Sequence, residues 1–222
     1  MNTTVVPTTN NSQAEIISTN KVIRNTFSLL ALTLAFSALT SAISMALNMP
    51  HPGILITLVG YFGLLFAISY FRNSGLGIAL VFALTGFMGL TLGPILNAYL
   101  SLPSGGMIIT TAMGGTAALF VGLASYALVS RKDFSFMGSF LMVGILVGFL
   151  AGLGAIFFEL PGLSLAVSTM FILLMSGLIL YETSNIIHGG ETNYVMATVT
   201  LFVAIFNLFT SLLHLLGFMN NE

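Results

Sequence analysis

Charged residues are scarce in this sequence. Only 5 Lys and Arg and 6 Asp and Glu occur among 222 residues, while hydrophobic residues make up 57% of the chain. A chain with so few polar groups lacks the surface needed to coat a globule in water, so the composition predicts a polytopic membrane protein embedded in the lipid bilayer. The formal net charge of -1, without any cluster of basic residues, excludes nucleic acid as a partner.

Cysteine is absent, which excludes disulfides and thiolate metal sites. The three histidines, His51, His188 and His214, fall in segments that the predicted topology keeps apart, so they do not converge on a metal ion. The HExxH, GxSxG and Walker-loop patterns of common enzymes are missing as well. We therefore expect no enzyme activity and no cofactor.

The chain divides into a polar start and a long apolar remainder. Residues 1–20 lack the basic start and short apolar core of a cleavable signal peptide, and they predict a disordered cytoplasmic tail. Residues 21–222 predict an all-α membrane domain, because a helix needs about 20 apolar residues to cross the bilayer. Breaks at Pro, Gly and Asn clusters give seven predicted spans: 26–47, 54–71, 76–97, 107–130, 136–158, 163–186 and 194–217.

The basic residues predict the orientation of these spans. Lys and Arg in short loops stay on the cytoplasmic side of a membrane. In a seven-span topology all five fall on one side: Lys21, Arg24, Arg72, Arg131 and Lys132. The amino terminus is therefore expected in the cytoplasm and the carboxyl terminus outside.

The last predicted span carries a polar stripe. Asn193, Thr200, Asn207, Ser211 and His214 are spaced by 7, 7, 4 and 3 residues, and Ala204 lies on the same side of the helix. Because polar groups facing lipid are costly, this side should face the bundle interior, and the span should be the central helix. Two interpretations remain: hydrogen bonds between helices, or the lining of a permeation path.

Glu182 lies near the cytoplasmic end of the sixth predicted span. A carboxylate there opposes the helix dipole and needs a cation or a proton. One interpretation is an interfacial acid neutralised by Arg72, Arg131 or Lys132, and the other is a titratable latch at the mouth of a cavity.

Four segments carry a resemblance to a known family. They are "YETSNIIHGGETNY", "ATVTLFVAIFNLFTSLLHLLGF", "TGFMGLTLGPILN" and "RKDFSFMGSFLM". Together they resemble the Bax inhibitor-1 family, and the "HGGETNY" loop resembles its bacterial YccA branch. The resemblance covers the chain from about Asn20 onward. It implies a bacterial inner-membrane protein whose helices form two groups of three around a central seventh.

Two functions follow from that resemblance. Relatives of YccA associate with FtsH, a membrane-anchored ATP-dependent protease, and restrain its action on other membrane proteins. Other members are pH-sensitive calcium leak channels with an acid late in the sixth span, a second acid in the seventh and a basic residue nearby. Glu182 matches the first acid and Arg72 the basic position, but Ala204 stands at the second acid.

The missing acid decides between these two functions. Two neighbouring carboxylates can share a proton and switch near neutral pH, whereas a lone Glu cannot. Calcium also prefers several oxygen ligands. The sequence therefore favours a modulator of an FtsH-type protease, with a calcium or proton leak, in which calcium is a permeant ion, as the alternative. It does not determine an oligomeric state.

Overall fold

Seven long helices make up the fold. The computed structural model describes residues 9–220, with side chains from Ile17 onward. The helices are α1 (Thr9–Ala46), α2 (Ile54–Phe71), α3 (Gly75–Leu100), α4 (Gly105–Ser130), α5 (Gly138–Phe157), α6 (Pro161–Ile187) and α7 (Tyr194–Met219), with one short 3-10 turn, η1 (Ser135–Met137). All seven are long and apolar enough to cross a membrane, and the described residues contain no strand, which confirms the predicted fold class.

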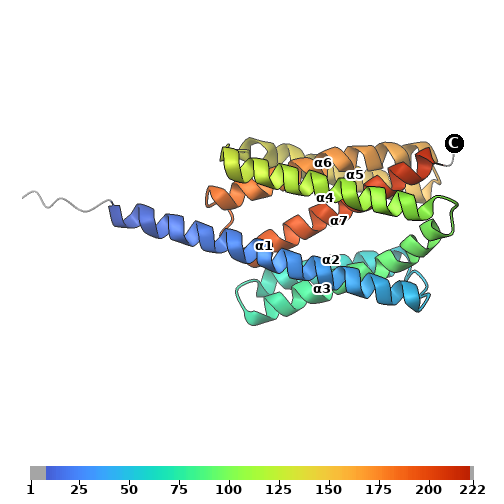
Figure 1. Cartoon of the computed structure of the whole chain (residues 1–222), viewed down its shortest axis with the longest axis horizontal. Coiled ribbons are helices and arrows are strands. Elements are labelled where there is room, and N and C mark those ends of the chain that lie inside the picture. The colour runs from blue at the N-terminus through green and yellow to red at the C-terminus, as the bar shows by residue number, and fades with distance from the viewer. Residues whose placement is uncertain (1–8, 221–222) are drawn as a thin grey trace, which may run out of the picture.

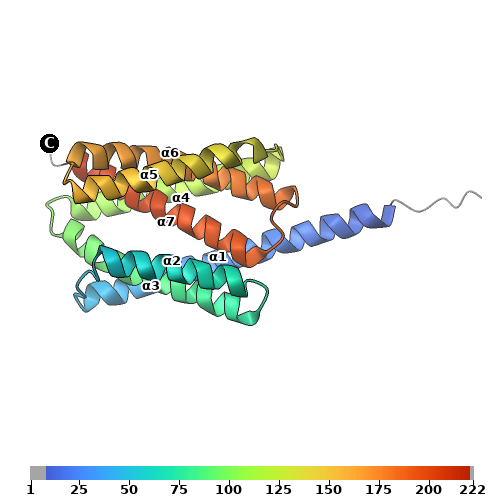
Figure 2. The ribbon, with the colours of Figure 1, turned by 180° about the vertical axis from the view of Figure 1, so that it is seen from behind.

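The helices form two groups of three with α7 between them. Helices α1, α2 and α3 pack together on one side, and α4, α5 and α6 on the other. Figure 2 shows α7 crossing diagonally from the first group to the second. This arrangement agrees with the one that the family resemblance implies.

The core explains the diagonal course of α7. Near its start, Val195, Val199 and Phe202 belong to a buried cluster shared with α1, α2 and α3. Further along, Ala204 and Leu208 belong to a second cluster shared with α4, α5 and α6. Because successive parts of one helix are buried by different groups, α7 is the element that joins the two halves of the molecule.

Small residues bring α1 and α3 into close contact. A Cβ added at Gly86, Gly89 or Gly93 of α3 would collide with atoms of α1. Where the backbones approach, the Ser44 Oγ of α1 donates a hydrogen bond of 2.9 Å to the Leu90 carbonyl of α3. The glycine row therefore holds α1 against α3, as small residues do in lipid, where helices gain little from the hydrophobic effect.

The start of α1 differs from the prediction for residues 1–20. The helix begins at Thr9, so residues 9–20 are helical instead of irregular, and α1 projects beyond the bundle (Figure 1). Hydropathy detects where a helix enters the membrane, but helical hydrogen bonding continues past that point once the helix is nucleated. Residues 1–8, the rest of the predicted tail, lie outside the described residues.

Candidate functional site

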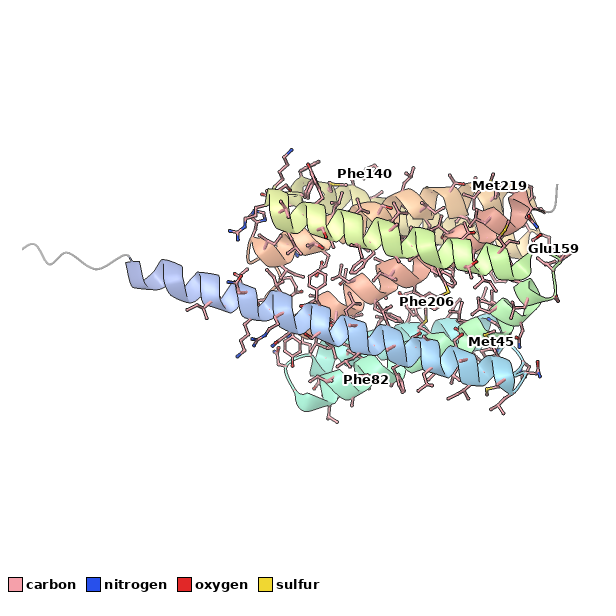
Figure 3. All side chains as sticks on the ribbon, viewed as in Figure 1. Met45, Phe82, Phe140, Glu159, Phe206 and Met219 are labelled. Atoms are coloured by element: carbon pink, nitrogen blue, oxygen red, sulfur yellow. The ribbon has the colours of Figure 1, made fainter. Side chains whose placement is uncertain are left out.

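One end of the bundle gathers most of the charged residues whose side chains the structure describes. It contains the α2–α3, α4–α5 and α6–α7 turns together with Lys21 and Arg24 of α1. We call it the basic end, since all five Lys and Arg of the sequence lie on it. Glu159 and Met219, the last residue of α7, lie at the opposite end (Figure 3).

The end of α6 and the α6–α7 turn, residues 184–193, form several hydrogen bonds at the basic end, and we call this segment the clasp. Helix α6 closes with a Schellman motif, in which the Gly190 N–H donates to the Asn185 carbonyl at 2.9 Å and the Gly189 N–H to the Ile186 carbonyl at 3.3 Å. Gly189 has a φ of 75°, a left-handed conformation that favours glycine. A Cβ at Gly190 would collide with the Asn185 side chain, so the "HGG" sequence determines how the chain leaves α6.

Asn193 fastens the clasp to the first group of helices. Its Oδ1 caps α7 by accepting from the Val195 and Met196 N–H groups at 3.0 and 3.1 Å. Its Nδ2 donates to the Arg72 carbonyl at 3.1 Å and to Asn73 Oδ1 at 2.8 Å, both beyond the end of α2. A single amide therefore starts α7 and holds it to the α2–α3 turn.

Ser184 and His188 fasten the clasp to the second group. The Ser184 Oγ accepts from the Phe134 N–H at 3.0 Å and donates to the Lys132 carbonyl at 3.0 Å. The His188 Nε2 lies 3.2 Å from the Arg131 carbonyl. The α4–α5 loop is thus joined to the end of α6 by side chains that sequence reasoning did not single out, although a Ser and a His one helical turn apart could have indicated a shared face.

Asp133 in the same loop organises the start of η1. Its Oδ1 accepts a hydrogen bond of 2.8 Å from the Ser135 N–H. The bond from that N–H holds the pKa of the Asp133 carboxyl below its ordinary value, and the Ser135 side chain and the nearby His188 act in the same direction.

Glu182 is buried at the basic end, with only 4% of its surface exposed. The side chain of Asn185 bonds to its carboxyl group, and Glu191 is the charged group close enough to act on it. Among the residues whose side chains the structure describes, no ion pair joins it to the predicted cations Arg72, Arg131 and Lys132. The Lys132 Nζ instead lies 5.9 Å from the centre of the Tyr126 ring.

The polar stripe on α7 is divided among several environments. Ala204 is fully buried and Ser211 is 9% exposed, while Thr200 and Asn207 are half-buried. The Asn207 Nδ2 donates within its own helix, to the Val203 carbonyl at 2.8 Å. Among the residues that the structure describes, the stripe bonds to another helix at His214, where the ring Nδ1 lies 2.8 Å from the Ser168 Oγ of α6.

Glu182 and Ala204 lie at different depths. Glu182 is five residues before the end of α6 (187 − 182 = 5) and Ala204 ten residues after the start of α7 (204 − 194 = 10). At about 1.5 Å per residue these positions are about 8 Å and about 15 Å from the helix ends. Ala204 therefore lies deeper in the bundle, in the same buried cluster as Ile179, which is one turn before Glu182.

Buried hydroxyl groups form a second polar feature that the sequence analysis missed. Thr183 and Thr26 have hydroxyl oxygens that are buried without a hydrogen-bond partner. The Thr198 Oγ1 donates to the Tyr194 carbonyl at 2.7 Å and reaches the Thr26 carbonyl at 3.3 Å. On α1, buried Thr and Ser recur at helical spacing, a signal that could have found them: Thr26, Thr33, Ser37, Ser41 and Ser44.

Metal binding finds no support at the basic end. Within the part of the chain that the structure describes, no three His, Cys, Asp or Glu side chains come together to hold an ion. What the site offers is a buried carboxyl group, a second carboxyl group nearby and a turn that connects the two halves of the bundle.

Comparisons with known proteins give the chain its relatives. Residues 19–221 match the family model described as "Inhibitor of apoptosis-promoting Bax1". The chain is 50% identical over 217 residues to the "Modulator of FtsH protease YccA" of Escherichia coli strain K12, covering 98% of this chain and 99% of that protein. It is 51% identical over 208 residues to an uncharacterized protein of Pseudomonas aeruginosa, covering 94% of each. An uncharacterized membrane protein of Vibrio cholerae is 41% identical over the full length of both chains.

Proposed function

The chain belongs to the Bax inhibitor-1 family, and from that premise we propose that it modulates an FtsH-type membrane protease. In this proposal the chain is a multi-pass inner-membrane protein that binds the protease and restrains the degradation of other membrane proteins. The observation that carries the proposal is 50% identity, across 98% of the chain, to a protein named as a modulator of FtsH protease.

The fold suits a protein that occupies such a protease without being destroyed quickly. An ATP-dependent protease must extract a substrate from the membrane, and α7 is buried by both groups of helices. The clasp adds hydrogen bonds from α6 and α7 to both neighbouring loops. Extraction of α7 therefore disrupts the contacts of both groups of helices, which makes the chain a slow substrate that competes with faster ones.

The proposal needs the amino terminus in the cytoplasm. All five basic residues lie at the end of the bundle where α1 begins, which is the side that the positive-inside rule assigns to the cytoplasm. A reporter fused after Glu222 should therefore read as external, and one inserted in the Arg131–Asp133 loop as cytoplasmic. A cytoplasmic reading at the carboxyl terminus would overturn this orientation.

Copurification combined with a flux assay tests the function itself. The tagged chain should retain the FtsH-type protease of its host through detergent extraction, and sealed vesicles containing the purified chain should show no calcium flux above empty vesicles. An unrelated seven-helix membrane protein expressed at the same level is the control for copurification. Calcium flux without copurification of the protease would show that the leak, and not modulation of the protease, is the function.

One observation favours the leak as a second candidate. Glu182 is buried, and the charged group that acts on it is the carboxyl of Glu191. Two acids are therefore neighbours, even though position 204 carries alanine instead of the second acid of the channel members. Ala204→Asp should add a third acid deeper in the bundle and produce pH-dependent cation flux that the unaltered chain lacks. Glu182→Gln combined with Glu191→Gln in that background should remove the pH dependence, because the remaining acid then has no partner with which to share a proton. A steep pH response already present in the unaltered chain, and unchanged by Ala204→Asp, would make the leak the leading function.

A further inference from the structure

A groove of about 470 Å³ runs between the two groups of helices, away from the basic end. Helix α1 lines one side of it from Leu34 to Met45, α4 lines the other, and aromatic residues of α7 form the floor. Figure 3 shows Phe206 between α1 and α4. On the rim, Met113 and Val121 are 58% and 59% exposed, so the groove opens on the surface that faces the membrane.

One polar group in this apolar groove has no partner. Ser41 lines the groove from α1 and is only 3% exposed, and its Oγ forms no hydrogen bond. Leaving a buried hydroxyl unsatisfied costs about 1–3 kcal/mol. The Ser41 hydroxyl therefore indicates that a ligand in the groove supplies its hydrogen-bond acceptor. Because Ser41 is five residues from the end of α1 at Ala46, it lies about 8 Å from that end.

A membrane offers two kinds of occupant for this groove, a transmembrane helix or a lipid acyl chain, and the volume of the groove favours the acyl chain. A transmembrane helix with side chains is about 10–12 Å across, so 470 Å³ would accept only about one turn of it. The same volume holds about 16 groups of the size of water, each taking about 30 Å³. A chain of about 16 methylene groups has the length of a membrane acyl chain.

We propose that this groove binds one acyl chain of a membrane glycerophospholipid, whose ester carbonyl accepts a hydrogen bond from the Ser41 Oγ. The chain lies along the α7 aromatics, with its ester toward the end of α1, where the hydrocarbon region meets the headgroups. The lipid fills the space between the two halves of the bundle and satisfies the buried hydroxyl of Ser41.

The absence of tryptophan from the sequence permits a direct test. Phe206→Trp places a single fluorophore on the floor of the groove, and Phe140→Trp places one on α5 at a position that is 69% exposed. Each protein is reconstituted in vesicles of phosphatidylcholine with brominated or ordinary acyl chains. Bromine quenches tryptophan on contact, so both proteins should lose fluorescence in the brominated bilayer, with Phe206→Trp quenched at least half as strongly as Phe140→Trp.

Two substitutions on α4 give a matched comparison. Ala117 lines the groove, whereas its exposed neighbour Ala118 does not. Adding Ala117→Phe should reduce quenching of the Phe206→Trp protein at least twofold and leave the Phe140→Trp protein unchanged, and Ala118→Phe should change neither. If Phe206→Trp is equally bright in both bilayers while Phe140→Trp is quenched, then a second copy or nothing fills the groove, and the proposal is overturned.

The role of Ser41 is tested by how the unfolding temperature changes with and without lipid. In lipid-free micelles Ser41→Ala should leave the unfolding temperature unchanged or raise it, because it removes an unsatisfied hydroxyl. Added phosphatidylcholine should raise the unfolding temperature of the unaltered chain, and the rise should be at most half as large for Ser41→Ala. Ser28→Ala, at an exposed serine of α1, should behave like the unaltered chain. Equal rises in all three proteins would overturn the assignment of the hydrogen bond to Ser41.

Discussion

At the scale of single residues, Glu182 is the group on which the chemistry of the basic end depends. The sequence predicts a cation as its partner, because three basic residues lie on the same side of the membrane. In the structure the groups acting on its carboxyl are Asn185 and Glu191. The difference arises from the Schellman turn, which brings residues 189–191 back over the end of α6 and which spacing along the sequence does not predict.

Glu182→Gln distinguishes these two environments by the sign of its effect on stability. A buried carboxylate without a counter-charge costs free energy, and glutamine keeps a polar group beside Asn185. We expect the substitution to raise the free energy of unfolding by about 1 kcal/mol, a shift of about 2–4 °C in a chain of this size. The measurement is thermal unfolding in micelles, with Glu159→Gln at the opposite end as the control. A loss of stability that occurs with Glu182→Gln but not with Glu159→Gln would indicate instead that a cation is the partner of Glu182.

At the scale of elements, the clasp explains how one turn couples the two halves of the bundle. Asn193 bonds to the α2–α3 turn, and Ser184 bonds to the α4–α5 loop. The sequence predicts most helices well, since span 54–71 matches α2 and span 194–217 lies within α7. Hydropathy marks where helices end but carries no information on which loops they touch, so the role of Ser184 became visible only in the structure.

Ser184→Ala tests whether the clasp stabilises the bundle. The substitution leaves the Phe134 N–H and the Lys132 carbonyl without their partner, so we expect a loss of about 1–3 kcal/mol in the free energy of unfolding. Ser176→Ala is the matched control, since the Ser176 Oγ bonds only within α6, to the Ile172 carbonyl at 2.7 Å. Denaturant unfolding in mixed micelles provides the measurement. Equal effects of the two substitutions would mean that the α4–α5 loop is not held by this bond.

At the scale of the whole molecule, two groups of helices share one central helix, and α1 extends beyond them at the basic end (Figure 1). A compact bundle resists extraction, so a protease acting on it needs a segment outside the bundle to grip. Residues 1–20 are polar and precede the apolar part of α1. The same end carries the basic residues, so in the proposed orientation this segment lies on the side on which a cytoplasmic protease works.

Deletion of residues 2–16 should slow turnover of the chain by the protease several-fold. The deletion removes the polar segment and leaves the buried contacts of α1, which begin at Thr26, in place. A pulse-chase measurement of half-life gives the rate, and the unfolding temperature of the purified deletion protein shows that the bundle is intact. Unchanged turnover with an intact bundle would mean that the protease grips the chain elsewhere.

The central claim, restraint of an FtsH-type protease, is tested most directly in proteoliposomes that contain only the purified protease, a short-lived membrane-protein substrate and this chain. The measured quantity is the rate of ATP-dependent substrate degradation as the ratio of chain to protease rises, with an unrelated seven-helix protein as the control. The account predicts a several-fold fall in that rate with this chain and none with the control. A rate that stays constant at every ratio would contradict it.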